Sequence, residues 1–399
     1  MATHLASRLD AVQPSATLAM TAKAAELKAQ GRKIYTFGVG EPDFNTPAHI
    51  RDAVASALSE ASHYTAVTGT AALKNAICLA TERDRGWSAK PDAVTVCVGA
   101  KHALFNLAMV LCEPGDEVVI PAPYWVSYPE QWRLFGGVPK LVATDAEGGF
   151  RLSPEALEAA ITPKTKAVIL CSPSNPTGGA YEEKDLAALA EVLLRHDIFV
   201  IVDEIYGDLV YDGFTHVSLA KIAPELRERL IVIDGVSKTY AMTGWRIGWA
   251  IAPPQITKAL SKVQGQSTTN PTAAAQIAAT AALTGPRDEI HRMRDVFAKR
   301  RRIMVDGLNA IPGVRCGMPR GAFYAFPDVT GLYGIRWGDK VLQTDDDVAL
   351  WQLDVCGIAA VAGTPFGGPG HIRYTYACGE DVIQEALGAL SSAVADAQR

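Results

Sequence analysis

Six short runs rich in valine and isoleucine alternate with helical patterns in the middle of this chain. They span residues 93–98, 117–120, 167–171, 198–203, 230–234 and 247–252. Nearly continuous apolar strands separated by helices are typical of a mostly parallel sheet that helices cover on both faces. Ligands of such sheets bind beyond the carboxyl ends of the strands. The sequence therefore predicts an α/β protein with its site at that edge.

Length and charge restrict the class of protein further. The chain has 399 residues, of which 48% are hydrophobic, so it can bury a large core in two or three domains or in one large α/β unit with an appendage. A net charge of -5 argues against nucleic acid or an anionic membrane as the main partner. The basic run 299–302 lies in a helical pattern over residues 287–309, and we expect it to form a solvated face.

Cysteine usage and the N-terminus point to a cytoplasmic protein. The seven cysteines are scattered and form no Cys-x-x-Cys pair, so neither a disulfide framework nor a metal site is expected. Arg8 and Asp10 put charge where a signal peptide needs an apolar core. No stretch of eighteen apolar residues is present, so we expect no membrane partner.

Lys238 lies in residues 235–249, directly after the apolar run 230–233. A lysine at the carboxyl end of a buried strand can form an imine, while the Ser237 hydroxyl and the Arg246 guanidinium hold a phosphate. A lone Ser-Lys pair would usually lie on the surface. The complete run after a strand instead favours a site for pyridoxal phosphate (PLP).

Asp203 ends the apolar run 198–203, where an unpaired carboxylate would be costly to bury. The protonated ring nitrogen of PLP is a suitable cation, and the ion pair would keep the ring an electron sink. A helix cap at the strand end is the alternative. The later Lys238 favours the cofactor role.

A phosphate site is also expected between a strand and the next helix, at Gly99, Ala100 and Lys101. The first N–H groups of a helix have no partner within the helix, and the helix dipole favours an anion there.

Six blocks, in order, resemble those of the fold-type I PLP-dependent aminotransferases, and they accompany the Lys238 run. They are residues 38–44, 63–65, 123–129, 172–178, 203–206 and 373–377. The resemblance covers most of the chain and is greatest for the prokaryotic aspartate aminotransferase subgroup. It implies a large PLP-binding domain of residues 46–290 with a mostly parallel sheet. A smaller α+β domain would be built from residues 1–45 and 291–399.

The resemblance also implies roles around the cofactor. Asn175 would bond the ring hydroxyl, with Tyr206 as a second donor, and Trp125 would stack on the ring. Tyr64 would reach the phosphate from the other subunit of a homodimer with composite active sites. From the residues alone, Asn175 before a proline could equally be a turn residue. The Trp125 indole could equally be core packing.

For the substrate, the resemblance implies that Arg373 grips the α-carboxylate with its fork, a geometry that lysine lacks. The Gly40 backbone, Trp125 and Asn175 would also contact the substrate, and Lys101 would meet the distal carboxylate of aspartate or 2-oxoglutarate. Many subgroup members have a lysine where this chain has Gln13. That difference makes use of prephenate doubtful.

The leading hypothesis is an aminotransferase that passes an amino group from aspartate to 2-oxoglutarate by a ping-pong cycle. An aminotransferase for aromatic or other neutral amino acids, or a PLP lyase, stays open within the same fold. A PLP-sensing regulator would need a helix-turn-helix, which the first forty residues do not offer. A nucleotide-binding oxidoreductase is disfavoured because neither Gly-x-Gly-x-x-Gly nor a Walker A pattern occurs.

Overall fold

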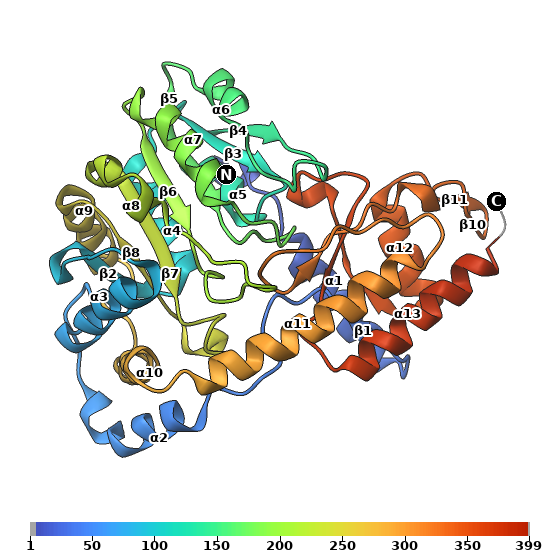
Figure 1. Cartoon of the computed structure of the whole chain (residues 1–399), viewed down its shortest axis with the longest axis horizontal. Coiled ribbons are helices and arrows are strands. Elements are labelled where there is room, and N and C mark those ends of the chain that lie inside the picture. Colours follow the sequence, from blue (N-terminus) through green and yellow to red (C-terminus); the bar gives the residue numbers. More distant parts are fainter. Residues whose placement is uncertain (1–4, 398–399) are drawn as a thin grey trace, which may run out of the picture.

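A seven-stranded sheet forms the centre of the larger part of the protein (Figure 1). The computed structural model describes residues 5–397; the remaining residues, including 1–4 of the segment considered as a signal peptide, lie outside that range. In spatial order the strands are β2 (Val94–Val98), β8 (Ile247–Ile251), β7 (Leu230–Gly235), β6 (Phe199–Asp203), β5 (Thr165–Cys171), β3 (Glu117–Ala122) and β4 (Val138–Ala143). Strand β8 runs antiparallel to β2 and β7, and the other neighbouring strands pair in parallel, so the predicted mostly parallel sheet is confirmed.

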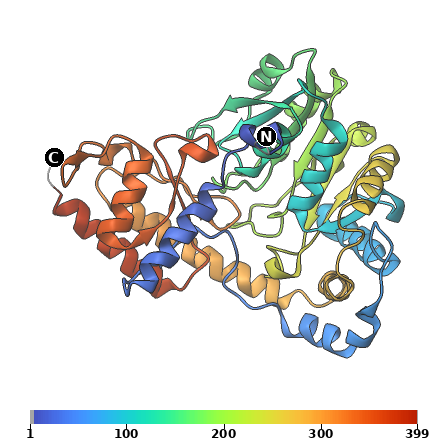
Figure 2. The same cartoon turned by 180° about the vertical axis from the view of Figure 1, so that it is seen from behind.

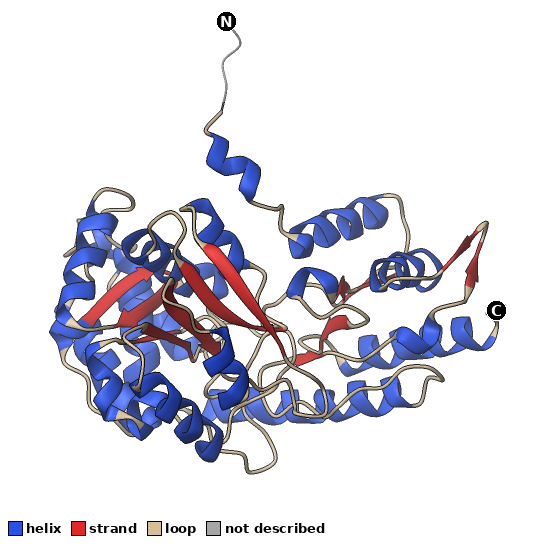
Figure 3. Ribbon diagram, turned by 90° about the horizontal axis from the view of Figure 1, so that it is seen from above, coloured by secondary structure: helices blue, strands red, loops and turns tan. Residues whose placement is uncertain are grey.

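Helices cover both faces of this sheet, as Figure 3 shows with blue helices around the red strands. One face packs against α2 (Ala48–Ser56), α3 (Ala71–Arg85), α6 (Pro154–Ala160), α7 (Glu183–Leu194), α8 (Leu219–Ile222) and α10 (Ala273–Thr284). The other packs against α4 (Ala100–Leu111), α5 (Ser127–Leu134) and α9 (Pro254–Gly265). On β6, Val200 and Val202 enter the first core and Ile201 enters the second. Burial on both faces is therefore the reason why the strands have no polar alternation.

The edge strand β4 is absent from the sequence prediction. Its side chains at Val138 and Leu141 are 45% and 44% exposed, and Pro139 interrupts the apolar pattern. Proline is tolerated on an edge strand because one row of N–H groups there has no partner strand. The strand consequently lacks the continuous apolar run by which the other six were recognised.

Both ends of the chain build the smaller part, which confirms that expectation. Strand β1 (Tyr35–Thr36) pairs in parallel with β12 (Ile358–Ala359), and β13 (Val361–Ala362), β14 (Ile372–Thr375) and β9 (Tyr324–Ala325) form an antiparallel sheet. Helix α1 (Ala16–Ala29), blue in Figure 2, lies against the red C-terminal region. The remaining helices are α11 (Asp288–Asn309), α12 (Asp345–Cys356) and α13 (Glu380–Ala395), and α11 runs from the larger part into the smaller (Figure 1).

The basic run in α11 is not a fully solvated face, and that expectation was wrong for two of its four residues. Arg300 is 8% exposed and donates to Asp43 at 2.7 Å. Arg301 is 1% exposed and forms an ion pair with Asp212. Successive positions of α11 are buried because other parts of the protein pack against more than one side of this helix. Carboxylates from distant segments compensate the buried charges.

The polar, glycine-containing composition of residues 328–347 by itself predicts an extended loop, and the structure corrects this prediction in part. They contain a short antiparallel hairpin of β10 (Arg336–Trp337) and β11 (Lys340–Val341). Gly338 adopts a positive φ of 58° in the two-residue turn, a conformation that glycine tolerates.

Among residues 5–397, no helix is long and apolar enough to cross a membrane.

Candidate active site

A cavity of about 270 Å³ lies at the carboxyl ends of β5, β6 and β7. Eleven of the thirteen site residues predicted from the sequence line it. They are Gly40, Ala100, Lys101, Trp125, Asn175, Asp203, Tyr206, Ser237, Lys238, Arg246 and Arg373. Segments separated by more than three hundred residues therefore converge at the edge of the sheet where a ligand was expected.

Lys238 presents the amine of a half-buried side chain to this cavity. Its Nζ donates a hydrogen bond of 2.6 Å to the carbonyl oxygen of Gly40. Burial lowers the pKa of the Lys238 amine to about 8, although the charge of Glu41 opposes the shift. A lowered pKa increases the fraction of neutral amine, which is the form that attacks a carbonyl carbon.

Asp203 ends β6 with a carboxylate that is 3% exposed. The Tyr128 hydroxyl donates to its Oδ2 at 2.8 Å, and the Ile205 amide donates to its Oδ1 at 3.2 Å. Burial raises the pKa of Asp203 to about 6, and these two hydrogen bonds limit the rise. A cation in the cavity would favour the ionised carboxylate. No helix begins at Asp203, because the chain continues as a turn, so the helix-cap alternative does not hold.

An anion cradle is formed where α4 begins. Gly99 precedes the helix with a φ of +83°, and a Cβ built there would lie 2.6 Å from Nη2 of Arg246. Only glycine therefore leaves room for the guanidinium beside the helix N-terminus. Arg246 itself adopts a left-handed φ of 59° and donates to the carbonyl of Thr243 at 2.9 Å. Unpaired helix N–H groups next to an arginine suit a phosphate group.

Arg373 is 2% exposed and has no ion pair with any carboxylate of residues 5–397. Its Nη1 donates to Oδ1 of Asn175 at 2.9 Å and its Nη2 to the carbonyl of Gly38 at 2.6 Å. The guanidinium lies 4.8 Å from the ring centroids of Tyr324 and Phe366. The Nε is buried without a hydrogen-bond partner, and burial lowers the pKa of this arginine. A ligand carboxylate would supply the missing charge.

Lys101 and Trp125 lie together on another wall of the cavity. The Lys101 Nζ lies 4.8 Å from the centroid of the Trp125 ring, a cation–π contact. Burial, followed by the charge of Arg246, lowers the pKa of Lys101. This cation therefore also lacks a carboxylate partner among the described residues and is available to a second acidic group.

Three residues named from the sequence lie elsewhere. Gly99 is adjacent to the cavity rather than in its lining. Gln13 lines a neighbouring pocket, where its backbone N–H donates to Oε2 of Glu130 at 2.8 Å. Tyr64 is 89% exposed and does not line the cavity of its own chain. The position of Tyr64 leaves its side chain free for contact with another subunit.

Among the cavity residues without a role predicted from the sequence, two contact predicted site residues, Tyr128 and Tyr324. Tyr128, in the first turn of α5, donates to Asp203 and makes an edge-on ring contact with Trp125, which lies just before that helix. Tyr324 places its hydroxyl 2.9 Å from that of Tyr206. The Tyr128 spacing could have suggested its role, whereas Tyr324 lies in an aromatic run that carries no such signal.

Comparison with known proteins agrees with this geometry. The family model "Aminotransferase class I and II" matches residues 32–390. The chain is 47% identical to an aspartate aminotransferase of Geobacillus stearothermophilus over 387 residues, which cover 96% of this chain and 97% of that protein. It is 46% identical to an aspartate/prephenate aminotransferase of Cereibacter sphaeroides over 391 residues, covering 97% and 98%. The crystal structure of the aspartate aminotransferase from Rhizobium meliloti superposes with a TM-score of 0.97 at 42% identity, and the match covers all of both chains. The chain therefore belongs to the class I and II aminotransferases, which are PLP-dependent enzymes.

Proposed function

We propose that this chain transfers the amino group of L-aspartate to a 2-oxo acid, with 2-oxoglutarate as the main acceptor. The observation that carries the proposal is Arg373, a buried guanidinium in the same cavity as the Lys238 amine, with an unpartnered Nε and no carboxylate partner in residues 5–397. An incoming amino acid offers the missing carboxylate together with an amino group. Lys101 offers a second cation for a dicarboxylic substrate.

The cavity fits PLP on two observations of this structure. Gly99 leaves room for Arg246 beside the N-terminus of α4, which suits the phosphate. The buried Asp203 carboxylate suits the ring nitrogen. Burial raises the pKa of Asp203, and a protonated ring nitrogen beside it would stabilise the ionised carboxylate.

The proposed cofactor contacts follow from these two fixed positions, the phosphate beside Arg246 and the ring nitrogen beside Asp203. Lys238 would link covalently, and Trp125 would stack on the ring. Asn175 and Tyr206 would bond the ring hydroxyl. The phosphate contacts would come from Ser237, Arg246, Tyr64 of a second subunit and the backbone amides of Gly99, Ala100 and Lys101.

Bound PLP withdraws electrons from the substrate carbon that bears the amino group. Lys238, with its pKa near 8, is suited to take the proton from that Cα and to deliver one to the Cα of the incoming 2-oxo acid. Arg373 binds the α-carboxylate with its fork, and Asn175 holds that fork in place at 2.9 Å. Gly40, whose carbonyl accepts from the Lys238 amine, lines the same cavity as Arg373.

We also propose the cellular setting and assembly that the resemblance implies. The seven cysteines, all within the described residues, are unpaired, which suits the reducing cytoplasm. The exposed Tyr64 supports a homodimer with composite sites. The proposed domain limits are residues 46–290 for the large domain and residues 1–45 with 291–399 for the small one, supported by the pairing of β1 with β12.

A panel of amino donors with 2-oxoglutarate tests the activity. We expect aspartate to give the highest kcat/KM, with neutral and aromatic donors well below it. Prephenate belongs in the acceptor panel because Gln13 stands where many relatives of this subgroup carry lysine. A higher kcat/KM for phenylalanine than for aspartate would overturn the aspartate proposal and favour the aromatic alternative.

Lys101→Ala should lower kcat/KM for aspartate. The loss should correspond to about 1.5–3 kcal/mol of transition-state stabilisation, the range for a hydrogen bond to a charged group. Alanine and phenylalanine should lose little, because they have no distal carboxylate. The matched variant Arg373→Ala should damage every donor alike, since all share the α-carboxylate. An equal loss for acidic and neutral donors in Lys101→Ala would mean that Lys101 serves the phosphate turn instead.

Mixed dimers test the composite site. If Tyr64 of one subunit completes the site of the other, Tyr64→Ala and Lys238→Ala chains should each be nearly inactive alone. After exchange, half of the dimers are hybrids, and each hybrid has one site free of both substitutions, so about a quarter of wild-type activity should return. Mass spectrometry verifies the exchange. Confirmed exchange with no return of activity would exclude the shared site.

A further inference from the structure

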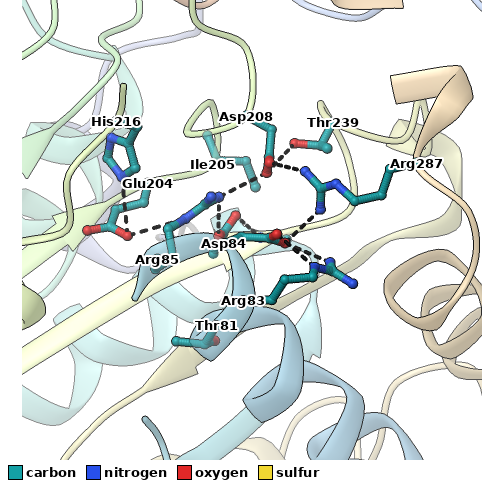
Figure 4. Close-up of polar contacts among 12 residues, drawn as sticks. Thr81, Arg83, Asp84, Arg85, Glu204, Ile205, Asp208, His216, Thr239 and Arg287 are labelled. Carbon is teal, nitrogen blue, oxygen red and sulfur yellow. Dashed lines mark hydrogen bonds and ion pairs between the residues drawn. The ribbon is translucent and has the colours of Figure 1, made fainter. Parts of the chain in front are cut away.

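A cluster of buried charged side chains lies beside the proposed cofactor cavity, where α3 ends (Figure 4). Arg85, at the end of α3, is 8% exposed and is surrounded by three carboxylates. Its Nη2 lies 3.1 Å from Oδ2 of Asp208 and 3.0 Å from Oδ2 of Asp234. Its Nε lies 3.7 Å from Oε2 of Glu204. Figure 4 shows the Arg85 side chain extending between Glu204 and Asp208.

Two of these carboxylates belong to the segment that follows β6. Glu204 is the immediate neighbour of Asp203, the proposed partner of the ring nitrogen. Asp208 comes two residues after Tyr206, the proposed donor to the ring hydroxyl. Arg85 therefore contacts, through Glu204 and Asp208, the turn that carries both residues proposed to contact the cofactor ring.

The third carboxylate belongs to the segment that carries the lysine. Asp234 lies near the end of β7, four residues before Lys238. On the other side of that lysine, Thr239 donates to Oδ2 of Asp208 at 3.4 Å. The two residues flank Lys238 in the sequence, and both are tied to the same guanidinium, Asp234 directly and Thr239 through Asp208.

Arg85 is the cation that the three carboxylates of the cluster share. Arg287 supplies a second cation to Asp208, at 2.5 Å, and His216 contacts Glu204 at 3.4 Å. Partial burial alone would raise the pKa of Asp208, but the two arginines outweigh this effect and hold the pKa well below the usual value. Burial raises the pKa of Asp234 to about 7, and Arg85 is its only ion-pair partner in the described chain. A guanidinium donates in several directions at once, which an ammonium on one flexible stem does not.

We propose that Arg85 is a positioning residue of this enzyme. It joins the segment of Asp203 to the segment of Lys238 at a set separation, so that one cofactor finds both partners already in place. Arg85 does not line the cavity. The inference rests on the proposed roles of Asp203 and Lys238.

Binding of PLP to the apoenzyme tests this inference without an activity assay. Arg85→Lys keeps the charge but loses the fork, so we expect the Kd for PLP to rise about tenfold, the low end for residues that orient a site from outside. The pH midpoint of the absorbance of lysine-linked PLP should shift as well. The matched control is Arg301→Lys, because Arg301 is also a buried arginine, 1% exposed, but its partners are Asp212 and the carbonyl of Pro319, at 2.8 Å for the latter. It has no hydrogen bond or ion pair with residues 203–208 or 234–239. The control should lose comparable thermal stability in the apo form and keep the wild-type Kd.

An Arg85→Lys protein that loses stability equally with and without PLP, and keeps the wild-type Kd and pH midpoint, would overturn the positioning role. If Arg85→Lys fails to fold, Asp234→Asn tests the same proposal. This variant removes the ion pair between Arg85 and Asp234, and it keeps the side-chain oxygen that accepts from the Gly235 amide at 2.7 Å. We expect an approximately threefold higher Kd, as for one net hydrogen bond; an unchanged Kd would overturn the role. Wild-type protein that forms no lysine-linked PLP would instead overturn the proposed function itself.

Discussion

Lys238→Ala should abolish transamination and the visible absorbance of lysine-linked PLP. Lys238 is the cavity residue whose amine has its pKa lowered to about 8, and it accounts both for the covalent link and for the proton transfer at Cα. PLP should still bind through its phosphate and ring contacts, more weakly than in the wild type. Absorbance spectra and turnover with aspartate measure both effects.

Lys258→Ala is the control, since Lys258 is an exposed lysine of α9 and should leave turnover unchanged. Near-normal turnover of Lys238→Ala would mean that another group carries the reaction. A variant that loses activity but keeps the lysine-linked absorbance would assign the covalent link to a different lysine.

Asp203→Ala should lower kcat by several powers of ten. Without the carboxylate the ring nitrogen loses the anion that keeps it protonated, and the electron sink weakens. Asp203→Glu should be far milder, because it keeps the charge at the end of β6. Steady-state kinetics of the two variants with aspartate and 2-oxoglutarate measure the difference.

Folding has to be checked in the same experiment. Removing the Asp203 carboxylate leaves the Tyr128 hydroxyl and the Ile205 amide without their acceptor, at a cost of about 1–3 kcal/mol each in stability. Thermal melting of both variants separates this cost from the catalytic loss. Small and equal losses of kcat in Asp203→Ala and Asp203→Glu would indicate that the carboxylate is structural.

The local pattern of the sequence was sufficient for most of the sheet and for the principal site residues. Strands buried on both faces appear as uninterrupted apolar runs, and polar residues that end them, such as Asp203, stand out against that background. Lys238 was recognisable for the same reason, because it follows a run of this kind within a few residues. The apolar runs and the polar residues that follow them are both patterns of neighbouring residues, so they can be recognised without knowing how the chain packs.

Only the tertiary structure decided which distant groups meet. Asp203 bonds Tyr128 from 75 residues away, and Arg85 reaches Asp234 across 149 residues, with no local pattern at either end to announce the contact. Arg301 looked like part of a solvated run and is almost fully buried, because its surroundings depend on how α11 packs against the rest of the chain. Continuous apolar runs identified the strands that are buried on both faces, whereas the pairing of buried charges depended on distances that exist only once the chain has folded.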